Sequence, residues 1–78
     1  MQENQHMTIK LQGIHGEQPA KHVKDLCIGD IIKWNFGYTS TVVELVPSKT
    51  GKMILCKLLA NGIIYDRRLG ADRLVAIG

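Results

Sequence analysis

The chain has few cysteines, few aromatic side chains and no long apolar run. Its 78 residues include two cysteines, one tryptophan, two tyrosines and one phenylalanine. No apolar stretch approaches the roughly 18 residues that a membrane-spanning helix requires, and no signal-peptide pattern opens the chain. Two cysteines are too few to staple a secreted domain of this size, so we expect reduced thiols in a soluble, cytoplasmic protein.

Residue groups for catalysis or metal binding are also missing. The spacing of His6, His15, His22 and Cys27 matches no zinc pattern, and the sequence has no Cys-x-x-Cys pair. The acidic residues are scattered singly, without a pair placed for acid–base chemistry. The segment SKTGK at 48–52 lacks the first glycine of a phosphate-binding loop. We therefore expect no catalytic residue, no metal and no cofactor.

Size and composition describe one small domain. With 45% hydrophobic and 22% charged residues, the chain has a globular rather than a disordered composition. Residues 1–6 are polar and aperiodic, so we expect a disordered lead-in before a single domain at 7–78. The net charge of +3 leans toward nucleic acid or an acidic partner without requiring either.

Short apolar or alternating segments separated by turn residues predict a mostly β fold. A loop is expected around Gly13, Gly16 and Pro19, one or two helical turns at 20–26, and a 3₁₀ turn at 70–73 before the last strand. Five or six short strands without a long helix predict a small closed barrel. The segments with strand patterns are residues 7–11, 31–36, 39–46, 52–60, 63–69 and 74–77.

The pair Asn61-Gly62 is the strongest hairpin signal in the chain. A two-residue loop at this point fixes the register of the flanking strands. Lys57 and Asp66 then face each other, and opposite charges across strands stabilise a pair by about 0.2–1 kcal/mol. The expected pairs are Ala60–Ile63, Leu58–Tyr65, Cys56–Arg67 and Ile54–Leu69 on one face, with Leu59–Ile64, Lys57–Asp66 and Leu55–Arg68 on the other.

This hairpin is apolar on both faces, although only one face can line the barrel. The N-terminal strand and the loop before Asp30 could cover the second face. Alternatively, that face is a surface for self-association or for a protein partner, because exposed apolar patches usually have a purpose. The expected partner surface comprises Met53, Leu55, Leu59, Ile64 and, in a turn, Tyr38.

The basic residues suggest a different ligand. Small barrels can bind single-stranded nucleic acid when cations surround aromatic side chains on which bases stack. We expect Trp34 and Phe36 to pack in the core on one strand face, and Tyr38 to be exposed. Arg67 should lie at the barrel mouth or pair with an acid such as Glu44. The candidate nucleic-acid-binding residues are Lys49, Lys52, Arg67, Arg68 and Arg73.

The region from Trp34 to Ile77 resembles an SH3-like barrel. Its features are meander strands, an Asn-Gly hairpin and a 3₁₀-like turn before a short last strand. The segments at 37–40, 48–52 and 72–75 are also similar to small uncharacterised proteins of phages and prophages of Gram-positive bacteria. This resemblance covers about three-quarters of the chain and implies no activity.

Two functions are therefore expected. The first is a non-catalytic binding or adaptor module, of phage origin if the resemblance holds, that engages a protein partner or itself through the apolar sheet face and loop aromatics. The alternative is a small barrel that binds nucleic acid through a basic surface. The fold alone does not choose between them.

Overall fold

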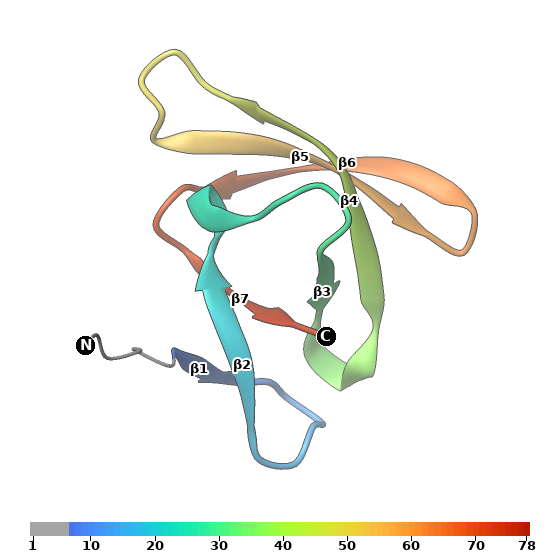
Figure 1. Cartoon of the computed structure of the whole chain (residues 1–78). Coiled ribbons are helices and arrows are strands. Elements are labelled where there is room, and N and C mark those ends of the chain that lie inside the picture. The colour runs from blue at the N-terminus through green and yellow to red at the C-terminus, as the bar shows by residue number, and fades with distance from the viewer. Residues whose placement is uncertain (1–6) are drawn as a thin grey trace.

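The computed structural model describes residues 7–78, which form one antiparallel sheet of seven strands (Figure 1). Neighbouring strands follow the order β1-β2-β7-β3-β4-β5-β6. The lead-in expected at residues 1–6 lies outside the described residues. The elements are β1 (Thr8–Lys10), β2 (Glu17–His22), η1 (Val23–Asp25), β3 (Ile31–Lys33), η2 (Asn35–Gly37), β4 (Thr39–Pro47), β5 (Met53–Ala60), β6 (Ile63–Gly70) and β7 (Leu74–Ile77), where η marks a 3₁₀ turn.

The hairpin of β5 and β6 confirms the register that the sequence predicts. Asn61 and Gly62 have φ values of 52° and 77°, the positive pair that a type I′ turn requires. Every expected cross-strand pair is present. The Nζ atom of Lys57 lies 3.4 Å from Oδ1 of Asp66, so the predicted charge pair is formed.

The N-terminal third contains a strand that the sequence did not predict. Residues Glu17–His22 form β2, between β1 and β7, where a loop and helical turns were expected. Pro19 is tolerated because pairing with β7 begins only at Ala20, so the missing N–H removes no bond from that ladder. Only Val23–Asp25 keep a helical form, as η1.

The strand predicted at 31–36 ends early. After Lys33 the chain enters η2, in which Phe36 takes a φ of 65°. The expectation that Trp34 and Phe36 share a core-facing strand face is therefore wrong. Trp34 packs against the core, whereas Phe36 is 65% exposed.

The end of the chain also differs from the expectation. The connection before β7 is a β-turn, closed by a 3.1 Å bond from Arg73 N–H to the Gly70 carbonyl, rather than a 3₁₀ turn. It places β7 between β2 and β3. The strands thus number seven instead of five or six, and within residues 7–78 the sheet is not closed, because β1 and β6 are its two edges.

The coiled sheet surrounds a single core. Ile32, Val42 and Leu58 are fully buried. Leu26, the residue after η1, is buried in the same cluster. Burying one such side chain contributes about 1.5–3 kcal/mol. The other members of the core are Val23, Ile54, Cys56, Leu69, Ala71 and Val75.

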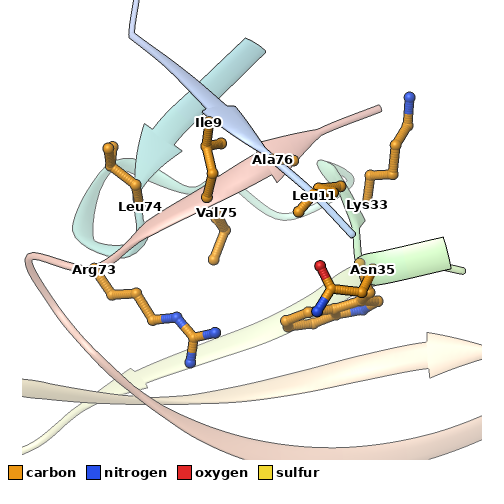
Figure 2. Close-up of a pocket in the computed structure, with 9 residues that line it drawn as sticks. Ile9, Leu11, Lys33, Asn35, Arg73, Leu74, Val75 and Ala76 are labelled. Atoms are coloured by element: carbon orange, nitrogen blue, oxygen red, sulfur yellow. The ribbon is translucent and has the colours of Figure 1, made fainter. Parts of the chain in front are cut away.

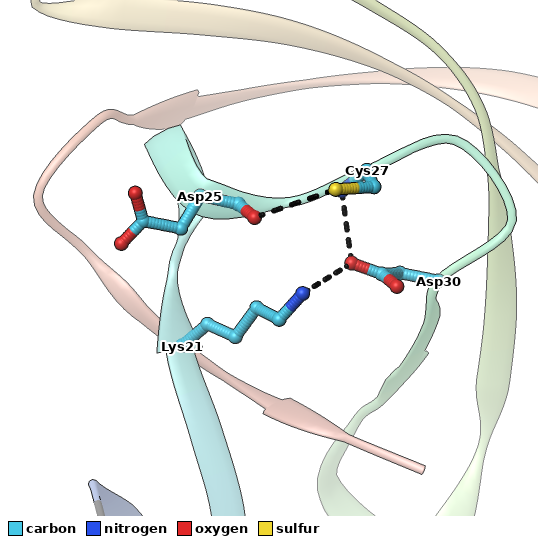
Figure 3. A network of polar contacts seen from close by, with 4 residues as sticks. All are labelled: Lys21, Asp25, Cys27 and Asp30. Atoms are coloured by element: carbon cyan, nitrogen blue, oxygen red, sulfur yellow. Dashed lines mark hydrogen bonds and ion pairs between the residues drawn. The ribbon is translucent and has the colours of Figure 1, made fainter. Parts of the chain in front are cut away.

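A polar contact fixes the loop before β3 to β2 (Figure 3). The carboxylate of Asp30 accepts hydrogen bonds from Lys21 Nζ at 2.8 Å and from the Cys27 backbone N–H at 2.9 Å. These two donors, Lys21 first, lower the pKa of Asp30, and the bond to Asp30 raises the pKa of Lys21. The contact therefore needs both groups in their charged forms.

Leu58→Ala should destabilise the domain by about 2–5 kcal/mol, because it leaves a cavity in the core. The matched control is Leu59→Ala, one residue along the strand on the opposite, partly exposed face. This control should cost less than about 1 kcal/mol. Urea unfolding followed by circular dichroism measures both, and equal losses would contradict the inner and outer assignment of β5.

Asp30→Asn should lower the free energy of unfolding by about 1 kcal/mol at pH 7, since a solvent-screened charged hydrogen bond is lost. Because the pKa of Asp30 is lower in the folded state, its carboxylate contributes stability at pH values above the unfolded-state pKa of about 3.9. This contribution is lost as the pH falls through the folded-state pKa. Because the pKa of Lys21 is raised, Lys21 stays charged through neutral pH, and its contribution to the free energy of unfolding is retained there. Unfolding curves of the two proteins should differ at pH 7 and converge once the pH has fallen below the lowered pKa of Asp30 in the folded state.

Candidate ligand-binding surface

Three of the aromatic side chains lie in one connection, residues 34–38, which we name the aromatic turn. The Trp34 N–H donates to the Tyr38 carbonyl at 2.7 Å, and the Gly37 N–H donates to the Trp34 carbonyl at 3.1 Å. These bonds close the turn between β3 and β4. Tyr38 is 70% exposed, as the sequence predicted, and Phe36 is exposed beside it.

The loop after β1 holds the aromatic turn in place. The Phe36 N–H donates to the Gln12 carbonyl at 2.7 Å, and the Gln12 N–H donates to the Asn35 side chain at 3.0 Å. A Cβ on Gly13 would lie 2.4 Å from Cδ1 of Phe36, so the ring rests directly on this glycine. A positive φ at Phe36 is a strained conformation for an aromatic residue, and these contacts are what hold it.

A hydrogen bond holds the indole N–H of Trp34, and the guanidinium of Arg67 lies over one face of the ring. Its Nε1–H donates to Ser40 Oγ at 3.0 Å, and Ser40 Oγ is 2.5 Å from the Tyr65 hydroxyl. Ser40 is the buried polar residue of the described core, and this network satisfies it. The Cζ atom of Arg67 lies 4.8 Å from the centroid of the Trp34 ring, within the range of a cation–π contact.

A small pocket of about 60 Å³ opens beside Trp34. Figure 2 shows Arg73 extending in the direction of Asn35. Ile9 of β1 and Leu11, which directly follows β1, lie on the other side of the pocket. The lining includes two cations, Lys33 and Arg73, and no acid. Lys33 Nζ already donates to the side chain of Gln18 at 2.9 Å. The complete lining is Ile9, Leu11, Lys33, Trp34, Asn35, Arg73, Leu74, Val75 and Ala76.

The structure does not gather the five predicted basic residues into one patch. Arg67 and Arg73 both border Trp34. Lys49 and Lys52 lie in the turn between β4 and β5, and Arg68 points to the other side of the sheet. None of these five residues takes part in the four ion pairs found within residues 7–78.

We name Trp34, Phe36, Tyr38, Arg67 and Arg73 the aromatic–arginine surface. The expected alternative, a pair between Arg67 and Glu44, is wrong, because Glu44 lies opposite Lys57 on the other face of the sheet. Ser40, Asn35 and Gly13, which hold this surface, were not predicted. A serine within a strand and a glycine in a loop carry no distinctive signal, since their roles depend on residues far along the chain.

The side of β4, β5 and β6 that faces away from the core is named the outer face. It carries three cross-strand rows: Val46–Leu55–Arg68, Glu44–Lys57–Asp66 and Thr41–Leu59–Ile64, with Met53 at one end. Ile64 is 60% exposed, and Met53 is exposed as well. The expectation that the N-terminal strand and the loop before Asp30 together cover this face is wrong as regards the strand, because β1 pairs at the opposite edge of the sheet. At one end, Val46, Pro47, Ser48, Met53, Leu55 and Arg68 line a shallow groove of about 410 Å³.

The two cysteines differ in their exposure. Cys56 is fully buried, and burial raises the pKa of its thiol, which keeps it protonated. Cys27 is exposed. Residues 7–78 contain no group of three His, Cys, Asp or Glu side chains placed for a metal ion. His6 lies outside the described part of the chain.

Comparison with protein-family models, curated proteins and solved structures yields no match for this chain. In the described region, no helix has both the length and the apolar character needed to cross a membrane.

Gly13→Ala should displace the Phe36 ring, because the new methyl group would overlap it. Gly16→Ala is the matched control, since Gly16 also has a positive φ of 84° but has no atom within 4 Å of an added Cβ. Both substitutions should lower the free energy of unfolding by about 1–2 kcal/mol, because alanine is strained at a positive φ. Only Gly13→Ala should also shift the Phe36 ring signals in NMR spectra, and unchanged signals would contradict the packing of Phe36 on Gly13.

Proposed function

We propose that this chain is a non-catalytic binding module with a partly open SH3-like barrel, whose aromatic–arginine surface binds single-stranded nucleic acid. The meander of β3 to β6 and the Asn61-Gly62 hairpin support the SH3-like assignment. A cytoplasmic location and kinship with small phage or prophage proteins of Gram-positive bacteria belong to the same proposal.

The observation that carries the proposal is the pairing of two arginines with one indole. Arg67 stacks on Trp34, and Arg73 lines the pocket beside it. Neither guanidinium joins an ion pair within residues 7–78. Both groups are therefore available to phosphate oxygens, which guanidinium binds with two parallel hydrogen bonds.

The exposed rings supply the second element of such a site. Phe36 and Tyr38 present large aromatic surfaces to solvent on a turn that backbone bonds hold in shape. Bases of a single strand stack on such rings, at about 1–3 kcal/mol per base. In a duplex the base faces are already stacked on one another, so this arrangement favours single strands.

Protein binding at the outer face is the second candidate function. It is favoured by the exposure of Ile64 and Met53 on a face that no described strand covers. The expected partner residues Leu55 and Leu59 are partly buried there, whereas Tyr38 belongs to the aromatic turn instead. The two candidates use opposite sides of the sheet and can be tested separately.

The test of nucleic-acid binding is fluorescence anisotropy with a labelled oligothymidylate and a labelled duplex at two salt concentrations. The single strand should bind more tightly, and its affinity should fall as salt rises, because phosphate contacts release counterions. Tyr38→Ala should weaken binding by about 5- to 150-fold, the equivalent of about 1–3 kcal/mol of lost stacking. Absence of binding at low salt would end this proposal.

A matched pair of arginine variants locates the site. Arg73→Gln and Arg68→Gln each remove one positive charge, but only Arg73 borders Trp34. Arg73→Gln should weaken oligonucleotide binding several-fold more than Arg68→Gln. Since the chain has a single tryptophan, binding should also quench its fluorescence in the parent protein. Equal effects of the two variants would place the ligand elsewhere.

A further inference from the structure

Strand β6 is a long, open edge of the sheet. It has eight residues, whereas the other edge strand, β1, has three. The type I′ turn makes Ala60 and Ile63 a hydrogen-bonded pair, so the residues of β6 alternate from there. The backbone groups of Ile63, Tyr65 and Arg67 bond to β5, and those of Ile64, Asp66 and Arg68 point away from it.

The outward backbone groups have no partner in the described chain. No backbone or side-chain hydrogen bond within residues 7–78 reaches the N–H groups of Ile64, Asp66 or Arg68. A strand with such a row of free donors and acceptors is a template for another strand. An extended segment can add to such an open edge as a further strand, with main-chain hydrogen bonds between the two.

We propose that β6 pairs antiparallel with β6 of a second copy of this chain, forming a symmetric dimer. Both surfaces are then the same strand, as a two-fold axis requires. The pairing continues the sheet from one copy into the other. It also joins the two outer faces, on which Ile64 is exposed.

The charges on the strand select one register. A two-fold axis at Asp66 would oppose two aspartates, and an axis at Tyr65 would leave Asp66 opposite Ile64. An axis at Arg67 places Asp66 opposite Arg68 of the second copy, twice in each dimer. Opposite charges in direct cross-strand opposition stabilise pairing, and like charges oppose it. The third register is therefore the one that the dimer uses.

The neighbouring residues are compatible with this register. Arg67 would face its own symmetry mate across the axis, but its guanidinium is held over Trp34 of its own chain. Arg68 has no ion pair within residues 7–78, and Asp66 makes a contact of 3.4 Å to Lys57 with half of its side chain still exposed. Each carboxylate can therefore accept the guanidinium of the second copy as a further partner.

Sedimentation velocity over a concentration series tests the proposal with the full chain. The parent protein should show a concentration-dependent species of twice the chain mass. Asp66→Arg and Arg68→Asp should each weaken the dimer by at least about tenfold, because each places like charges across the interface. The double variant Asp66→Arg/Arg68→Asp restores opposite charges and should recover the parent dissociation constant to within about threefold.

Lys57→Gln is the control for the contact inside the chain. It removes the partner of Asp66 without changing β6, so dimerisation should stay within about twofold of the parent value. Far-ultraviolet circular dichroism at low concentration verifies that every variant is folded. A parent protein that is monomeric throughout the series, single variants that dimerise normally, or a double variant that fails to recover would each overturn the proposal. Oligonucleotide binding by a monomeric parent protein would leave the proposed function intact.

Discussion

Burial of the inner side of β5 is the interaction on which the rest of the structure depends. Leu58 is enclosed between Val42 of β4 and Tyr65 of β6, its partners on the two neighbouring strands. Ile54 and Cys56 continue the same buried row. A domain of this size buries only about 60% of the surface that its unfolded chain exposes, so a central row of this kind supplies much of the available stability. The placement of both candidate surfaces follows from it.

The adjacent residues Arg67 and Arg68 point to opposite faces of the sheet, because strand residues alternate between faces. Arg67 points inward and ends over Trp34, at the edge of the core. Arg68 points outward to the apolar outer face and the open edge of β6. The same short segment can therefore contribute to a ligand surface on one side and to association on the other.

The Trp34–Ser40–Tyr65 network connects the core to the aromatic–arginine surface. A buried hydroxyl without partners would cost free energy, but here the indole N–H and the phenol both bind it. The network joins the end of β3 to β4 and β6 and so fixes the indole relative to Arg67. An indole held in this way has little conformational freedom of its own.

The local parts of this structure followed from the sequence, because they depend on interactions between residues close in the chain. The Asn61-Gly62 turn sets its own backbone geometry, and the register, the Lys57–Asp66 pair and the two faces of β5 follow from that turn. The exposure of Tyr38 was also predicted. A few adjacent residues determined each of these features.

Other features depended on contacts between distant segments. Phe36 is exposed because Gln12 and Gly13 hold the turn in a conformation that its own residues would not favour. Residues 17–22 form a strand because β1 and β7 supply partners on both sides. A bulge between Val42 and Glu44 turns Glu44 outward, away from Arg67. These three features depend on the whole sheet, because the free energy that stabilises them comes from contacts between residues that meet only when the chain has folded.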